Sequence, residues 1–229
     1  DRIACNSPLI FCSPDESIVL GSDIEPVYHK AEACRGKALC QYYGKNIIMR
    51  SAEHGKLLEL LSKYRSEDPQ QASTANDFSS FIRMHPDCCE RSLAIGHLTG
   101  SAWLVSPNQR HVLLMHHRKL LRWLQPGGHA DGNPDLAAVA LREAGEETGL
   151  TGLTVEAGIF DLDRHRIPVH GEEPEHWHYD FRFVLQAEGV EFVGNQESLA
   201  LAWFDIATLC TDPAMDASIR RMAGKWLRR

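Results

Sequence analysis

Three acidic residues, Glu143, Glu146 and Glu147, have the type and spacing that could hold a metal ion. In an α-helix, side chains at i, i+3 and i+4 share one face and lie within about 6 Å of one another. Three carboxylates repel, and a divalent cation that prefers hard oxygen ligands, such as Mg²⁺ or Mn²⁺, offsets that repulsion. Glu-rich helix surfaces are also common as plain solvated faces, so the spacing alone leaves both interpretations open.

The residues before the glutamates decide between these interpretations. The whole unit is Gly128-x5-Pro134-x7-Arg142-Glu143-Ala144-Gly145-Glu146-Glu147-Thr148-Gly149-Leu150. It resembles the Nudix box, G-x5-E-x7-R-E-U-x-E-E-x-G-U, in which U is a bulky apolar residue. The matched positions are Gly128, Arg142, Glu143, Glu146, Glu147, Gly149 and Leu150. Together with the run from Trp123 to His129, the resemblance covers residues 95 to 212.

Two positions depart from the family pattern. Pro134 replaces the first Glu of the box, and the small Ala144 stands at the bulky apolar position. The resemblance implies that the missing Glu supports the loop and the Arg. Here Asn133 could cap the helix and Pro134 could take its first position. Asp135 lies two turns before Arg142 on the same face and is the candidate to replace the missing carboxylate.

The resemblance implies a role for each matched residue. Glu143, Glu146 and Glu147 would hold Mg²⁺, with Mn²⁺ as the alternative ion, and Arg142 would organise the carboxylates. Glu143 is the first choice of general base and Glu147 the second. The implied reaction is hydrolysis of a diphosphate linkage in a nucleoside diphosphate derivative or a similar organic diphosphate, which needs neutralised phosphate charge and an in-line water.

Further candidates lie outside the glutamate helix. Glu197, in Gln196-Glu197-Ser198, stands where many family members have a loop acid that completes the metal site or acts as base. Four histidines cluster within fourteen residues, and metal binding, phosphate contact and a merely polar strand face all stay open for them: His165, His170, His176 and His178. The expected substrate-binding residues are Gly127, Gly128, His129, Arg118, Lys119, His178 and Asp180.

Two other functions compete with hydrolysis. A nucleotide-binding sensor or interaction module of the same fold would bind without cleaving, and Pro134 is its main support. Isopentenyl diphosphate isomerases share the fold but use a Cys, for which only Cys88 and Cys89 stand near a plausible strand. Subfamily markers outside the box are mostly absent, so we name no substrate beyond an organic diphosphate.

The patterning that must position these residues is α+β. The resemblance implies a Nudix fold, a mixed β-sheet sandwiched between helices, with an N-terminal helical extension. Helices are expected at His54–Tyr64, at Thr74–His85 with Asn76 or Asp77 as cap, at Asp135–Thr148, and from Asp212-Pro213 onward. Strands are expected at Leu98–Val105, His111–His116, Val155–Asp161, Trp177–Gln186 and Leu199–Phe204. We divide the chain into a segment of unclear structure (1–48), a helical leader (49–92) and the Nudix hydrolase domain (93–229).

The bulk composition limits the partners. The formal net charge of −7 over 229 residues gives no general reason to bind nucleic acid. No apolar run approaches the roughly 18 residues of a membrane span, so we expect a soluble, cytoplasmic protein acting on a small molecule. A homodimer is left open. The seven cysteines lack Cys-x-x-Cys spacing and indicate free thiols, with a local disulfide or metal clip in the first 40 residues as the alternative.

Overall fold

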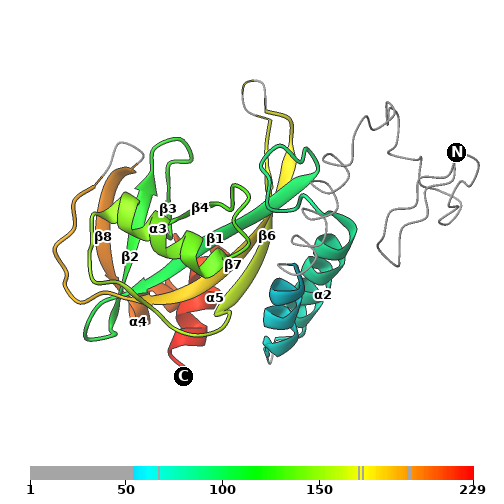
Figure 1. Cartoon of the computed structure of the whole chain (residues 1–229). Helices are drawn as coiled ribbons and strands as arrows, with labels where there is room; N and C mark the ends of the chain where they lie inside the picture. The colour runs from blue at the N-terminus through cyan, green and yellow to red at the C-terminus, as the bar shows by residue number, and fades with distance from the viewer. Residues whose placement is uncertain (1–53, 67, 170, 172, 195–197) are drawn as a thin grey trace, which may run out of the picture. The chain divides into compact units, whose positions relative to one another are not determined.

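The computed structural model describes residues 54–66, 68–169, 171, 173–194 and 198–229 (Figure 1). All of them belong to one compact unit, Asn46–Arg229. The segment 1–48, with its four cysteines, and the residues His170 and Glu197 lie outside the described residues. The division of the chain at 48 and 92 therefore stays a prediction. No described helix has both the length and the apolar character needed to cross a membrane.

Two groups of four strands, separated by one helix, lie between helices at both ends of the described chain. A helix over residues 54–63 comes first. It is followed by α2 (Pro69–Met84), β1 (Gly96–Val105), β2 (His111–His117), β3 (Arg122–Leu124), β4 (Gly127–His129), α3 (Leu136–Thr148), β5 (Thr154–Val155), β6 (Asp161–Ile167), β7 (His176–Gln186), β8 (Ser198–Asp205), α4 (Ile206–Thr211) and α5 (Ala217–Trp226).

One mixed sheet contains all the labelled strands. Its centre is the parallel pair β1 and β7, which are in register from Gly96 and Trp177 to Val105 and Gln186. On the side away from β1, β7 pairs antiparallel with β5 and β6. On the side away from β7, β1 pairs antiparallel with β4 near its middle and with β2 at its end. The strand β2 in turn pairs antiparallel with β3 and β8. This sheet confirms the predicted α+β class.

Each face of the sheet is covered by helices (Figure 1). Because side chains alternate along a strand, Leu98 and Phe181 point to the face covered by α2 and α3, and both are fully buried. Trp103 points the opposite way and packs with Ile219 and Met222 of α5. The predicted sandwich of a mixed sheet between helices is therefore present, and α3 is held against the middle of β1.

The polar side of β7 is buried as well. The side chain of Arg182 is 3% exposed and forms ion pairs with Asp180 (2.8 Å), Asp163 (3.3 Å) and Asp161 (3.5 Å). Arg221 of α5 reaches Asp161 and Asp163 at 2.7 and 2.9 Å. Burial opposes ionisation of Asp163, but the neighbouring arginines hold the pKa of its carboxyl well below the usual range. This charged network joins α5 to the strands that surround the candidate site.

The helix α2 begins five residues earlier than the pattern predicted. Asp68 caps it by accepting a hydrogen bond from Gln70 N at 2.9 Å, and Pro69 takes the first position. The prediction of Asn76 or Asp77 as the cap was wrong, because the apolar stripe starts a full turn and more after the true helix start. Gln71 is 4% exposed and bonds both backbone groups of Leu162 in β6, at 3.0 and 3.2 Å.

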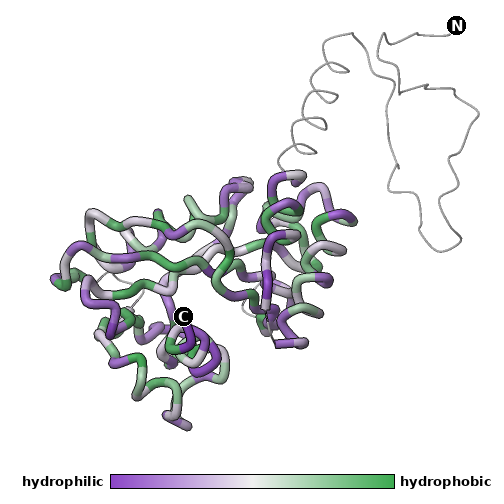
Figure 2. Tube along the Cα trace, turned by 90° about the horizontal axis from the view of Figure 1, so that it is seen from below, coloured by the Kyte–Doolittle hydropathy of each residue, from purple (hydrophilic) through white to green (hydrophobic). Residues whose placement is uncertain are grey.

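Two other boundaries also differ from the prediction. The expected strand Val155–Asp161 is split, with β5 ending at Val155 and β6 starting at Asp161, because Gly158 (φ 92°) bends the chain between them. The expected start of the last helix at Asp212 was wrong as well. Asp212 is the C-cap of the short α4, and Asp216 caps α5. The chain is hydrophilic near its C-terminus (Figure 2), where Lys225, Arg228 and Arg229 lie.

Candidate functional site

The helix that carries the glutamates, α3, has well-defined ends. Asp135 is its N-cap and accepts a hydrogen bond from Ala138 N at 3.0 Å. Gly149 ends it in the left-handed conformation with φ of 67°. Asn133 accepts from Asp135 N rather than capping the helix itself. Among the described residues Asp135 forms no ion pair with Arg142, so the structure gives no support to the idea that Asp135 replaces the missing box Glu.

The three glutamates differ in exposure and in their partners. Glu147 is only 5% exposed and accepts a hydrogen bond from Gly127 N at 2.9 Å. The side chain of Glu143 is 17% exposed and that of Glu146 is 61% exposed. Arg142 bridges these last two, with Nη2 2.7 Å from Glu143 Oε1 and Nη1 3.1 Å from Glu146 Oε2. The guanidinium of Arg142 thus contacts the carboxylates of both Glu143 and Glu146, so oxygens of these two residues lie close to one positive charge.

The glycine turn packs directly on this helix. A Cβ at Gly128 would overlap the carboxylate of Glu143, and a Cβ at Gly127 would overlap Ser101 of β1. Glycine at 127 permits the close approach of β4 to the backbone of β1, and glycine at 128 leaves room for the Glu143 carboxylate. The backbone at 127–128 therefore lies against the side chains of Glu143 and Glu147, and its closeness to substrate stays a prediction.

Other contacts hold the loop between β4 and α3 where the box Glu is missing. Arg91 forms a two-point ion pair with Asp131, Nε to Oδ1 and Nη2 to Oδ2, both at 2.5 Å. The backbone N–H of Ala130 and that of Gly132 donate to the carbonyls of Leu98 and Cys89, at 3.1 and 2.8 Å. The sequence analysis did not find this anchor, because Arg91 lies forty residues away from its partner in a turn with no recognisable pattern.

Several expected substrate-binding residues lie away from α3. Arg118 and Lys119 are exposed in the turn between β2 and β3, and Arg118 Nη2 donates to the Ser198 carbonyl at 3.3 Å. Asp180 is 2% exposed and accepts from Thr99 Oγ1 at 2.9 Å and Ser101 Oγ at 2.7 Å, besides its pairing with Arg182. These partners favour a positioning role for Asp180, and a substrate contact there stays a prediction. Glu197, the expected fourth metal ligand, lies outside the described residues.

His129 and His178 belong to a histidine cluster beside the glycine turn. Its members are His97 of β1, His129 of β4, His165 of β6, and His176 and His178 of β7. His129 Nε2 and His176 Nε2 lie 3.3 and 3.2 Å from His178 Nε2. Burial and then neighbouring imidazoles lower the pKa of His97 to about 4 and that of His178 to about 2.

Sequence reasoning missed His97. It faces His178 because the two residues are register partners in the parallel pair β1 and β7. Parallel pairing joins residues that are far apart in the chain, and no short-range pattern reveals such a register. A strand at Leu98–Val105 was predicted, but not which distant strand would supply its neighbours.

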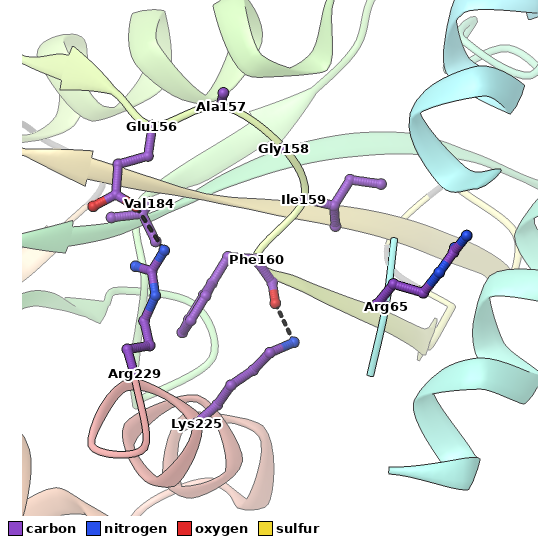
Figure 3. Close-up of a pocket in the computed structure, with 9 residues that line it drawn as sticks. All are labelled: Arg65, Glu156, Ala157, Gly158, Ile159, Phe160, Val184, Lys225 and Arg229. Atoms are coloured by element: carbon purple, nitrogen blue, oxygen red, sulfur yellow. Dashed lines mark hydrogen bonds and ion pairs between the residues drawn. The ribbon is translucent and has the colours of Figure 1, made fainter. Parts of the chain in front are cut away.

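A surface pocket lies elsewhere and contains none of the predicted site residues (Figure 3). It is lined by Arg65, Glu156, Ala157, Gly158, Ile159, Phe160, Val184, Lys225 and Arg229. Arg229 pairs with Glu156 at 2.7 Å, and Lys225 donates to the Phe160 carbonyl. Two of its cations are thus already engaged within the protein, and the acidic helix does not border it.

Comparisons with known proteins agree with this geometry. The family model of the NUDIX domain matches residues 97–227. A curated protein named putative 8-oxo-dGTP diphosphatase 3, from Mycobacterium tuberculosis, is 30% identical over 126 residues, which are 51% of this chain and 56% of the relative. The chain therefore spans little more than half the length of that relative.

Solved structures with a similar arrangement also exist. A NUDIX-family hydrolase from Clostridium perfringens is 26% identical with a TM-score of 0.45, and covers 58% of this chain and 96% of its own. A MutT protein from Methanosarcina mazei Go1 is 17% identical with a TM-score of 0.46, and covers 59% of this chain and 96% of its own.

Proposed function

Because the chain belongs to the NUDIX domain family, we propose that it hydrolyses a diphosphate linkage in a nucleoside diphosphate derivative or similar organic diphosphate, with Mg²⁺ as cofactor. The observation that carries this proposal is the packing of Glu147 and Glu143 against Gly127 and Gly128, on the helix where Arg142 also pairs with Glu146. The name of the curated relative, a diphosphatase of 8-oxo-dGTP, supports a nucleotide as the substrate class.

The donor set fits a hard divalent cation. Glu143, Glu146 and Glu147 offer carboxylate oxygens, which Mg²⁺ and Mn²⁺ prefer, and Arg142 already lies between two of them. When bound, the ion would neutralise phosphate charge and polarise the phosphoryl group. Glu197 is kept in the proposal as a further ligand.

The other residues have complementary tasks. Glu147 is buried and fixes the turn through its bond to Gly127 N, so it is poorly placed to move a proton. Glu143 is less buried and faces Gly128, which makes it the better general base, with Glu147 as the alternative. Arg142 organises the carboxylates. The backbone of Gly127 and Gly128 lets substrate approach, and Arg118 and Lys119 are candidates for phosphate contact from the turn between β2 and β3.

A metal-dependent release assay tests the proposal. The panel consists of nucleoside triphosphates, nucleotide sugars, ADP-ribose and dinucleoside polyphosphates, each with and without Mg²⁺. Glu146→Gln should lower turnover at least about 100-fold, because it removes a ligand whose ion contributes several kcal/mol to the transition state.

The matched control is Glu59→Gln. Glu59 is 63% exposed on the helix over residues 54–63 and pairs with Lys63 at i,i+4, much as Glu146 pairs with Arg142. This variant should turn over like the wild type. Equal activity of Glu146→Gln and the wild type would contradict the mechanism.

One observation favours a second function, a nucleotide-binding sensor or interaction module. Pro134 occupies the position of the box Glu, so the chain departs from the family pattern where the loop meets the helix. Nucleotide binding measured by calorimetry without turnover of any panel member would support it. The isomerase alternative is weaker, because Cys88 and Cys89 are 0% and 7% exposed and belong to the hydrophobic core.

A further inference from the structure

Three strands bring imidazole nitrogens together beside the glycine turn. His97 of β1, His129 of β4 and His178 of β7 each offer a ring nitrogen, and these atoms all lie within 4.8 Å of one another. His176, two residues before His178, extends the group, since its Nε2 is 3.2 Å from His178 Nε2. Three ring nitrogens therefore meet between β1, β4 and β7, and a fourth imidazole, that of His176, contacts His178.

His97 is buried without hydrogen bonds. Its exposed fraction is 3%, and neither Nδ1 nor Nε2 has a hydrogen-bond partner within the described part of the chain. A buried polar group without a partner costs about 1–3 kcal/mol. A buried imidazole aimed at three others is a poor arrangement for packing alone, but a good one for binding a ligand that accepts electron pairs.

The ring N–H groups of neutral histidines cannot supply a hydrogen bond for each nitrogen–nitrogen contact in the cluster. His176 Nδ1 lies 2.8 Å from the Pro174 carbonyl and donates to it, so in the neutral ring Nε2 carries the lone pair. Both His176 Nε2 and His129 Nε2 face the same nitrogen, His178 Nε2. The Nε2 atom of a neutral His178 carries at most one proton and donates at most one hydrogen bond. One of its two contacts, with His129 or with His176, is therefore not a hydrogen bond donated by His178.

Two of the distances between ring nitrogens match those in four-coordinate zinc sites. Zn–N bonds of about 2.0–2.1 Å at tetrahedral angles place ligand nitrogens about 3.3–3.4 Å apart. The two Nε2–Nε2 distances are 3.3 and 3.2 Å. The bond from His176 Nδ1 to a carbonyl is also the kind of second contact that orients a metal-ligating imidazole.

We propose that His97, His129 and His178, with His176 beside them as the nearest further imidazole, form a second metal site, which binds Zn²⁺ or a similar transition-metal ion. Imidazole nitrogens suit such ions, whereas the carboxylates of α3 suit Mg²⁺. The site joins β1, β4 and β7, and it holds His129 next to Gly128. It therefore positions the glycine turn against Glu143. His165 is not a ligand in this proposal, because it is 42% exposed and pairs with Asp163 at 3.1 Å.

Metal reconstitution of the full chain tests the site without relying on turnover. The protein is stripped with a chelator and then titrated with Zn²⁺ or Co²⁺ in excess Mg²⁺, which competes for the carboxylates of α3. We expect one Zn²⁺ per chain by elemental analysis, and the visible absorption bands of four-coordinate Co²⁺ with nitrogen ligands. Failure of the wild type to retain Zn²⁺ against Mg²⁺ would overturn the proposal.

Variants locate the ion. His97→Asn and His178→Asn should each weaken Zn²⁺ binding at least about 100-fold. The matched control His165→Ala, from the same cluster, and Glu146→Gln, from the glutamate helix, should bind Zn²⁺ like the wild type. Circular dichroism confirms that each variant is folded, and the Co²⁺ spectrum of the wild type gives the ligand type even where a variant does not fold.

A second group could compete for the ion. His54, Cys88 and Cys89 also bring ligand atoms within 4.8 Å of one another. Thiolate ligands add strong near-ultraviolet charge-transfer bands to a Co²⁺ spectrum, so a site of that kind is recognised directly. Such bands, with Zn²⁺ binding lost in Cys89→Ser and kept in His97→Asn, would refute the histidine site.

Discussion

Replacing Gly128 by Ala displaces a single carboxylate and leaves the rest of the fold intact. The new Cβ would lie 2.8 Å from Glu143 Oε2, and closer still to the other two carboxylate atoms, whereas ordinary contacts lie at 3.4–4 Å. The carboxylate must therefore move by about 1 Å. A misplacement of about this size costs about 100-fold in rate, or about 2.7 kcal/mol in the activation barrier.

The expected result is a separation of activity from stability. The side chain of Glu143 is 17% exposed at the edge of the helix and can rotate, so the free energy of unfolding should fall by no more than about 1 kcal/mol. We expect kcat/KM on the best substrate of the panel to fall about 100-fold, with a melting temperature close to that of the wild type. Activity within twofold of the wild type would refute the placement of Glu143 at the reaction centre.

Two other glycines provide the controls. Gly145→Ala adds the same methyl group on α3, where the nearest heavy atom is Leu150 O at 3.9 Å. It should keep activity and raise stability by up to about 1 kcal/mol, because alanine favours the helix interior. Gly127→Ala would instead meet Ser101 Cα of β1 at 2.7 Å, so it should destabilise the whole domain.

Three further predictions concern stability. Gly100→Ala should cost about 1–3 kcal/mol in denaturant unfolding, because its Cβ would lie 2.5 Å from Leu136 O, and an unchanged midpoint would contradict the close approach of α3 to β1. Asp163 is partly buried, but Arg182 keeps its pKa well below the usual range, so its contribution to stability is present above about pH 3.9 and is lost as pH falls further. Asp163→Asn should therefore flatten the acid side of the stability curve, and an unchanged acid slope would refute this. Asp135→Ala should lower stability by about 1 kcal/mol and Asp135→Asn should restore it, since both Asp and Asn cap helices; a loss of activity in both would instead indicate a catalytic need for the carboxylate.

The sequence predicted the elements in which one strong local signal dominates. The alternation of Tyr179, Phe181 and Phe183 placed β7 within one residue of its start, and the glycine that ends α3 was found directly. The segment that carries Glu143, Glu146 and Glu147 was predicted as a helix, and it is present as α3. In each case the deciding residues are neighbours in the chain.

What could not be predicted depends on distant partners. The histidine cluster needs the parallel register of β1 and β7, which pairs His97 with His178. The loop after β4 is held by Arg91, which no motif links to Asp131. The start of α5 was misplaced because Asp212 and Asp216 are both good caps, and only packing of the short α4 distinguishes them.

The two hydrogen bonds between Gln71 and Leu162 oppose aggregation of the protein through the edge of β6. Among the labelled strands β6 pairs only with β7, so its other side would offer free backbone groups to an incoming chain. Exposed strand edges of this sort are templates for aggregation. The side-chain amide of Gln71 occupies both groups of Leu162, as one residue of another strand would. One residue of α2 thus covers the backbone groups of Leu162 at this edge of the sheet. We therefore expect Gln71→Ala to make the protein more prone to form β-rich aggregates on storage.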